Sequence, residues 1–272
     1  MPYPPQIVPG SPLAEHSPQH SFAVPFTLAF QPVYDIRNGA ILAHEALVRG
    51  PTGSEAASVI AQITPENRDS FDRMCRVKAI AMASALDLQT GLSLNCMADA
   101  ITDPVACLRS TFIAANHYGF PVERLIFEFR ELDYLRDASH LRLVTEHFRK
   151  QGVQTAIDNV GAGFAGLGLL CEMETDLVKL DVSLVRCIEG DLRRQQLVRS
   201  IVKLCHDIDI QIIVKGVETE AEFNALRALG VIHFQGFYLG QPKREGLRSQ
   251  AAITLPVVSP SRGHGSKLGR SA

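Results

Sequence analysis

The sequence predicts an α/β fold: a single barrel of mostly parallel strands with helices outside, in which one strand runs antiparallel. Three observations predict it. Apolar, β-branched segments alternate with segments of helical periodicity, which is typical of a parallel sheet covered by helices. Polar residues stand at the ends of apolar segments, and in a parallel barrel such ends converge on one face. The 272 residues also suit one barrel, which needs about 250.

Eight segments are rich in apolar and β-branched residues, so we expect them to be strands. They are 27–34, 41–48, 91–96, 124–129, 153–158, 176–181, 210–215 and 231–235. Apolar residues recur at helical intervals at 66–86, 138–150, 191–207 and 219–229. Thr219 followed by Glu222 resembles a capping box at the start of the last helix.

The first two strands break the alternation of strand and helix. Only residues 35–40 separate them, and this linker contains the turn-forming pair Asn38-Gly39. A parallel connection needs a dozen or more residues. We therefore expect a hairpin, and with it one antiparallel strand in the barrel.

One barrel domain is expected over 23–250, between a disordered leader at 1–22 and a disordered tail at 251–272. The leader is rich in Pro, His and Ser and lacks the apolar core of a signal peptide, and the tail is rich in Ser and Gly. No window approaches the ~18 apolar residues of a membrane helix. We therefore expect a soluble, cytoplasmic protein that does not bind membranes.

The net charge and the spacing of the cysteines argue against a nucleic acid-binding protein and a metal-finger protein. The net charge is -2, from 27 basic and 29 acidic residues, so nothing overall attracts a nucleic acid polymer. The six cysteines are widely spaced and none forms a metal-finger pair, which is typical of reduced thiols.

Seven polar residues stand at or near the ends of expected strands. They are Glu45, Asn95, Glu128, Asp158, Lys179, Lys215 and Gln235. The three carboxylates and one carboxamide form an all-oxygen set suited to a hard divalent cation such as Mg²⁺ or Mn²⁺. The competing interpretation is that such residues cap strands and bond to neighbouring loops. Seven of them on one rim favour a functional site.

Between Phe26 and Pro242 the motifs resemble the EAL domain family of cyclic di-GMP phosphodiesterases. They are QPV at 31–33, HEALVRG at 44–50, SLN at 93–95, EFRE at 128–131, DNVGAGF at 158–164, VKLD at 178–181, KGVET at 215–219 and QGF at 235–237. The resemblance implies a modified TIM (βα)8 barrel with one antiparallel strand. It also implies bacterial cyclic di-GMP signalling and two divalent metals that bridge a phosphodiester and a water.

The resemblance also implies a role for each matching residue. The ligands of the first metal would be Glu45, Asn95, Glu128 and Asp158. Lys179 would orient the nucleophilic water, with Asp181 as an acidic partner nearby and Glu218 and Gln235 as supporting residues. Glu131 would hold the loop after Asp158, and Gln31 and Arg49 would contact the dinucleotide. A buried ion pair with Asp181 is an alternative role for Lys179.

Two residues depart from the family pattern. Asn159 stands where the DDFG motif has its second aspartate, and Lys215 stands where AEGVET has its first glutamate. Relative to the family pattern, Asn159 adds one positive charge and Lys215 adds two, so the net charge of the site rises by 3. Two unit charges ~4 Å apart interact by about 4 kcal/mol at an effective dielectric of 20, and a divalent ion doubles this. The second metal site is therefore predicted to be lost, with Mg²⁺ or Mn²⁺ at one site only.

The sequence leaves several functions open. The leading hypothesis is a degenerate member with little or no hydrolysis, in which Lys215 grips a phosphate of cyclic di-GMP, or in which a protein partner binds the outer surface. The alternative is an active phosphodiesterase that releases linear pGpG. A Schiff-base barrel enzyme that uses Lys179 is a third hypothesis.

The segment 160–170 follows the Asp158 position. In the family it lies near a symmetric dimer contact, so we expect a homodimer. Alternatively Phe164, Leu167 and Leu170 simply cover the barrel.

Overall fold

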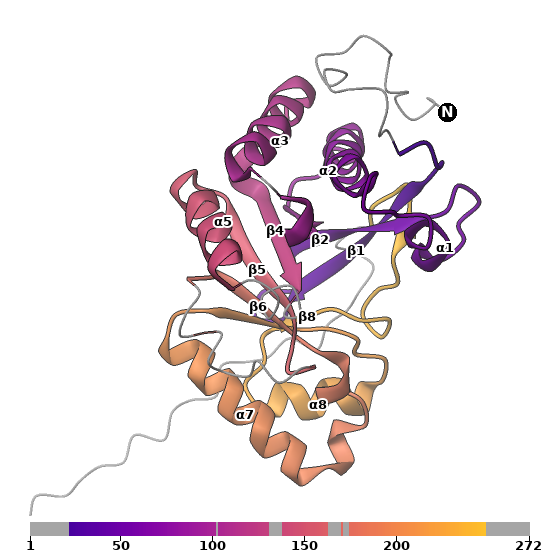
Figure 1. Cartoon of the computed structure of the whole chain (residues 1–272). Helices are drawn as coiled ribbons and strands as arrows, with labels where there is room; N and C mark the ends of the chain where they lie inside the picture. The colour runs from indigo at the N-terminus through magenta and orange to yellow at the C-terminus, as the bar shows by residue number, and fades with distance from the viewer. Residues whose placement is uncertain (1–21, 102, 131–137, 163–169, 171–173, 249–272) are drawn as a thin grey trace, which may run out of the picture.

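The eight expected strands all form, and they close into a barrel with one short extra strand at its edge (Figure 1). The computed structural model describes residues 22–101, 103–130, 138–162, 170 and 174–248. The strands are β1 (Thr27–Asp35), β2 (Ala40–Arg49), β3 (Gly91–Asn95), β4 (Leu125–Arg130), β5 (Gln154–Val160), β6 (Leu177–Leu180), β7 (Gln211–Val214), β8 (His233–Phe234) and β9 (Lys243–Arg244).

Strand β1 is the reversed strand. It pairs antiparallel with β2 on one side and with β8 on the other, whereas β2 to β8 run parallel to their neighbours. The hairpin turn uses Gly39 at a positive φ of 68°, and Asn38 Oδ1 accepts a hydrogen bond from Ala40 N at 2.9 Å. The expected hairpin and antiparallel strand are confirmed.

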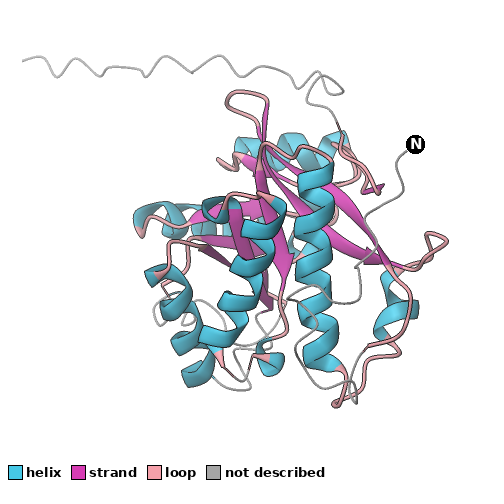
Figure 2. Ribbon diagram, turned by 90° about the horizontal axis from the view of Figure 1, so that it is seen from above, coloured by secondary structure: helices cyan, strands magenta, loops and turns pink. Residues whose placement is uncertain are grey.

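Helices surround the strands (Figure 2). They are α1 (Ala56–Ile60), α2 (Arg68–Ala85), α3 (Pro104–Tyr118), α5 (Ala138–Lys150), α7 (Leu192–Asp207) and α8 (Glu220–Ala228), with 3-10 turns η3 (Ala98–Ala100), η4 (Val122–Arg124), η5 (Val182–Leu184) and η6 (Ile188–Gly190). The four expected helices form within three residues of their expected bounds. The capping box between Thr219 and Glu222 is also present.

Helix α3 was not singled out from the sequence. Its buried face consists largely of small residues such as Ala114 and Ala115, so its apolar periodicity is weak. Its ends are nevertheless marked. Asp103 accepts two backbone hydrogen bonds as the N-cap, Pro104 is the first helical residue, and Gly119 ends the helix at a left-handed φ of 69°.

The barrel interior is layered because alternate residues of a strand face inward. One buried apolar layer contains Val33, Ala43, Ile126, Ala156, Leu177 and Ile213. A polar residue stands two positions further along each of these parallel strands and two positions earlier on the reversed β1, and Ser93 of β3 and Gln235 after β8 complete the ring. We call this set the polar layer: Gln31, Glu45, Ser93, Glu128, Asp158, Lys179, Lys215 and Gln235.

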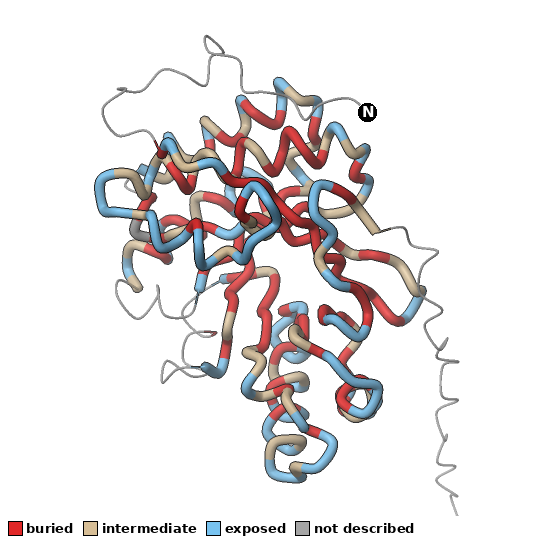
Figure 3. The backbone as a smooth tube through the Cα atoms, turned by 90° about the vertical axis from the view of Figure 1, so that its right-hand side faces the viewer, coloured by how far each residue is buried: buried red, intermediate tan, exposed pale blue. Residues whose placement is uncertain are grey.

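The larger core lies between the strands and the helices. It includes Phe30, Phe127 and Phe148, each fully buried. Figure 3 shows buried residues along the strands and exposed ones in the loops. No described helix is long and apolar enough to cross a membrane, and the five cysteines in the described part are free.

Candidate functional site

Lys179 lies at the centre of the polar layer and its side chain is fully buried. Its ammonium donates to Glu45 Oε2 at 2.5 Å and to both oxygens of Glu128 at 2.9 Å. A buried cation requires such partners, because burial without them carries a large desolvation cost. The alternative ion pair with Asp181 is wrong: Asp181 lies beyond the end of β6 and accepts from Ser183 N at 2.8 Å, which caps η5.

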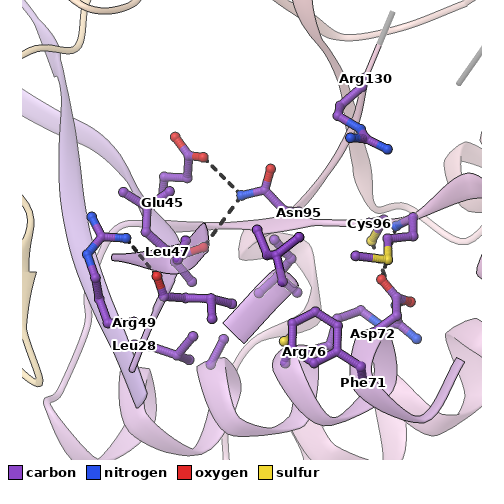
Figure 4. Close-up of a pocket in the computed structure, with 18 residues that line it drawn as sticks. Leu28, Glu45, Leu47, Arg49, Phe71, Asp72, Arg76, Asn95, Cys96 and Arg130 are labelled. Carbon is purple, nitrogen blue, oxygen red and sulfur yellow. Dashed lines mark hydrogen bonds and ion pairs between the residues drawn. The ribbon is translucent and has the colours of Figure 1, made fainter. Parts of the chain in front are cut away.

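Glu45 accepts hydrogen bonds from three different side chains of the site. Besides Lys179, Gln235 donates to it at 2.8 Å and Asn95 Nδ2 donates to Oε1 at 2.9 Å, the bond drawn in Figure 4. Burial raises the pKa of Glu45, but the charge on Lys179 and these hydrogen bonds outweigh it and lower the pKa to about 2. Glu45 is therefore ionised at neutral pH.

Glu128 shares the same ammonium, and Ser93 donates a hydroxyl hydrogen bond to its Oε1. Burial and the nearby charge of Glu45 raise the pKa of Glu128 to about 7, against the attraction of Lys179. Two carboxylates that share one cation cannot both be fully compensated, so the less well bonded one takes up a proton more readily. Ser93 was missed from the sequence, although it is the inward residue of β3 two positions before Asn95.

A second cation lies at the other side of the rim. Lys215 follows β7, and its Nζ is 2.5 Å from Asp158 Oδ1 and 2.6 Å from Asn159 Oδ1. Asn159 has a left-handed φ of 62°, a conformation that asparagine tolerates better than most residues. The ammonium thus bridges the two residues at which the family pattern would have two aspartates.

The residues fit one divalent cation better than two. Asn95, which bonds to Glu45, has an Oδ1 that accepts no hydrogen bond from the described residues, and neither does Asp158 Oδ2, so two oxygen atoms are free for a cation. The second position does not fit, because the Lys215 ammonium stands where an anionic ligand is needed. Within the described ranges no three His, Cys, Asp or Glu side chains gather as a metal site.

Two cavities flank Glu45. The first, about 250 Å³ and here called the Arg49 cavity, is lined by Glu45, Arg49, Phe71, Asp72, Cys75, Arg76, Asn95, Cys96, Arg130 and neighbours (Figure 4). The second, about 260 Å³ and here called the Gln235 cavity, is lined by Gln31, Glu45, Leu47, Val182, Lys215, Gly216, Glu218, Gln235, Gly236 and Phe237. The site therefore offers two compartments of similar size that share Glu45 in their walls.

The remaining expected residues fall in or near these cavities. Gln31 Nε2 donates to Gly240 O at 3.1 Å, and Gln31 Oε1 accepts from Gln235 at 3.4 Å. Glu218 lines the Gln235 cavity but is exposed and ion-paired with Arg186, a partner that sequence reasoning missed because it lies 32 residues away. Glu131, Phe164 and Leu167 lie outside the described residues, and Leu170 is buried.

A model of the EAL domain family matches residues 22–242. A standalone versatile EAL protein from Vibrio cholerae O395, solved with cyclic di-GMP bound, superposes with a TM-score of 0.81 at 44% identity, covering 84% of this chain and 97% of that one. BlrP1 of Klebsiella pneumoniae, in complex with manganese and cyclic di-GMP, gives 0.79 at 30% identity, covering 85% of this chain and 59% of that one.

A curated relative is the blue light- and temperature-regulated antirepressor BluF of Escherichia coli K12. It is 30% identical over 227 residues, which is 82% of this chain and 56% of BluF. The chain thus spans little more than half of BluF and of BlrP1.

Proposed function

Because the chain belongs to the EAL domain family, we propose that it is a degenerate member that binds cyclic di-GMP as an effector and hydrolyses it slowly or not at all. The observation that carries this proposal is the position of Lys215, whose ammonium bridges Asp158 and Asn159. It stands where the family pattern places a ligand of the second metal.

The formal charge of the site supports the proposal. Three carboxylates and two lysines of the polar layer sum to -1. With aspartate at 159 and glutamate at 215 the same site would carry -4, which two divalent cations would neutralise. A charge of -1 calls for at most one such cation, and extra positive charge in a confined site is repelled. Two-metal hydrolysis, in which the ions activate water and stabilise the leaving oxygen, would thereby lose one of its ions.

The two cavities fit a cyclic dinucleotide. Each has room for one base, and Glu45 lies between them, so a ligand that spans both would lay a phosphodiester across the polar layer. Arg49 lines one cavity and Gln31 the other, as their motif positions imply. Cyclic di-GMP is bound by the Vibrio cholerae protein that superposes along 97% of its own length.

The chain's own cations would do the binding. Lys215 is 21% exposed, so its ammonium can exchange an Asp158 contact for a phosphate oxygen of the ligand. Lys179 is inaccessible and instead fixes Glu45 and Glu128 in position. Where one Mg²⁺ or Mn²⁺ is bound, Asn95, Glu45, Glu128 and Asp158 would hold it, and it would polarise a phosphoryl oxygen.

A regulatory role through a protein partner is the second candidate function. The observation that favours it is the similarity to BluF, whose name describes an antirepressor. A cyclic di-GMP-binding barrel and a partner-binding surface are compatible, since the ligand would occupy the rim and leave the outer helices free.

The test is a calorimetric titration with cyclic di-GMP in EDTA and in Mg²⁺, with a parallel assay for linear dinucleotide. We expect similar binding in both buffers and little product. Lys215→Ala should weaken binding by about 10- to 150-fold, the value of one charged hydrogen bond. Lys203→Ala, which removes an exposed lysine of α7, is the matched control and should change nothing. If no binding occurs at about 100 μM ligand in either buffer, the effector proposal fails.

A further inference from the structure

A groove lies on the outside of the barrel between α3 and α5, which are neighbours there (Figure 1). Its volume is about 410 Å³, and none of the polar-layer residues lines it. Six residues of α3 form one wall, among them Val105, Phe112 and Ile113, and the other wall contains His147 of α5 and Gln151 just after it. We call this hollow the α3–α5 groove. The cyclic di-GMP site does not use it.

The groove exposes large apolar side chains. Val105 is 47% exposed and Ile113 is 41% exposed, and Leu143 of α5, one turn before His147, is 61% exposed. Single exposed apolar residues are common on protein surfaces, but several of them beside a hollow are typical of a protein-binding site. The apolar wall is therefore a surface that a partner can cover.

The length of the groove suits a helix. From Val105 to Asn116 the helix α3 rises about 16 Å, which is about three helical turns. A third helix can lay its side-chain ridges between two neighbouring helices, and binding of an amphipathic helix in such a groove is a recurrent mode of recognition.

The polar side chains of the groove have no partners within the protein. Arg109, Asn116, His147 and Gln151 line it, and in the described part of the chain none of these side chains has a hydrogen bond or an ion pair. They are therefore available to the polar groups of a ligand that covers the apolar wall.

The charge of the groove is positive. No carboxylate lines it, and α3 contains no acidic residue. Arg109 is exposed, as is Lys150 just before Gln151. Glu146, which precedes His147, is ion-paired with Arg142 at 3.8 Å. A partner with carboxylates would complement this charge.

We propose that the α3–α5 groove binds an acidic amphipathic helix of a protein partner, whose apolar side chains contact Val105 and Ile113 and whose carboxylate contacts Arg109. A nucleic acid backbone would match the arginine but would leave the apolar wall uncovered. The inference rests on the regulatory role through a partner, the second candidate function, and names the surface and the kind of partner.

The first experiment identifies what the groove binds. The probe is a phage-displayed library in which one face of a three-turn helix is randomised on a small scaffold protein, and the bait is the immobilised full chain. We expect enriched sequences with apolar residues at positions i, i+4 and i+7 and with Asp or Glu beside them. No enrichment, or enrichment of basic sequences only, would overturn the inference.

The second experiment locates the binding site. Ile113→Glu should weaken the enriched helices by about tenfold or more, because a charge then meets their apolar face. Ile208→Glu is the matched control, since Ile208 is 43% exposed beyond the end of α7, and it should leave binding unchanged. Equal binding to the Ile113 variant and to the unmodified protein would overturn the inference. No enriched helix together with weaker self-association of the Ile113 variant would identify a second copy of the chain as the occupant and would overturn it as well.

The third experiment tests the charge. Arg109→Glu should weaken the acidic helices by about tenfold or more, and their affinity for the unmodified protein should fall as salt is raised. Arg193→Glu, on the exposed face of α7, is the matched control. Undiminished binding to the Arg109 variant would refute the assigned partner chemistry. Every variant should keep the cyclic di-GMP affinity of the unmodified protein, so a failure of the groove and a failure of the effector proposal are separate results.

Discussion

Under the proposed function, returning two residues to the family pattern should create a second metal site and raise the rate of cyclic di-GMP hydrolysis. The change is the double substitution Asn159→Asp with Lys215→Glu, which returns both departures to the family pattern. Lys215 Nζ lies within 2.6 Å of oxygens from Asp158 and Asn159, so a metal bound to either oxygen at about 2.1 Å would lie less than about 5 Å from the ammonium. At this distance the ammonium of Lys215 and a divalent metal ion would repel each other strongly.

The size of the effect follows from the charges. A unit charge ~4 Å from a divalent ion contributes roughly 8 kcal/mol at an effective dielectric of 20. Removing Lys215 relieves that repulsion, and each new carboxylate adds a comparable attraction. Because Lys215 is 21% exposed, water screens these terms and the figure is an upper bound. Even a third of it corresponds to a gain in metal affinity of about a hundredfold.

The assay is chromatographic detection of linear pGpG with Mg²⁺ or Mn²⁺ for the unmodified protein, both single variants and the double variant. The double variant should be the most active, and the effects should be non-additive because both residues would bind one ion. Lys203→Glu makes the same charge change as Lys215→Glu, but on the exposed surface of α7, and should leave hydrolysis at the level of the unmodified protein. A double variant that folds and binds cyclic di-GMP but hydrolyses none would refute the reasoning, and additive gains would argue against a shared ion.

Three further outcomes are expected. Lys179→Met should lower the free energy of unfolding in urea by about 3–5 kcal/mol at pH 7, because Glu45 and Glu128 lose their shared cation; a loss below about 1 kcal/mol would contradict the buried ion pair. Burial lowers the pKa of His44 from 6.5 to about 4, so the folded state binds fewer protons in that range. The contribution of His44 to stability should therefore fall by about 2 kcal/mol between pH 7 and pH 5, while Glu128, whose pKa is raised to about 7, contributes in the opposite direction. His44→Gln should raise the stability at pH 5 relative to pH 7 by about 2 kcal/mol, and an unchanged pH dependence would exclude this role of His44. Light scattering should report a homodimer, and a pure monomer at high micromolar concentration would refute that expectation.

Strand periodicity explains why much of the site was predictable from the sequence. On several strands an inward apolar residue is followed two positions later by a polar one. Examples are Ile126 with Glu128 on β4 and Leu177 with Lys179 on β6. Because the period of a strand is two, these polar residues had to meet in one layer. The hairpin was predictable because the linker between its two strands is too short for a parallel connection.

The partners of these residues were not predictable in the same way. An ion pair between Lys179 and Asp181 was one alternative, since the two residues are two positions apart near the end of one strand. Asp181, however, lies past the end of β6, and its side chain caps η5. The contacts of Lys179 with Glu45 and Glu128 span 134 and 51 residues of sequence. Such pairs depend on the closure of the barrel, which periodicity alone does not specify.

The buried ion pair between Asp72 and Arg76 was missed for a different reason. Both residues share the face of α2 that holds Phe71 and Ala79, and an acidic residue four before an arginine ordinarily indicates an exposed ion pair. The apolar residues Phe71 and Ala79 lie at the same helical spacing, and they indicate that this face of α2 is buried.

The proposal that Lys215 takes the place of the second metal is tested most directly by anomalous diffraction from crystals grown with cyclic di-GMP and Mn²⁺. We predict no manganese peak between Asp158 and Asn159, at most one peak near Asn95 and Glu45, and Lys215 Nζ within hydrogen-bonding distance of a phosphate oxygen. Two manganese peaks, one of them beside Asn159 with Lys215 turned away, would contradict it.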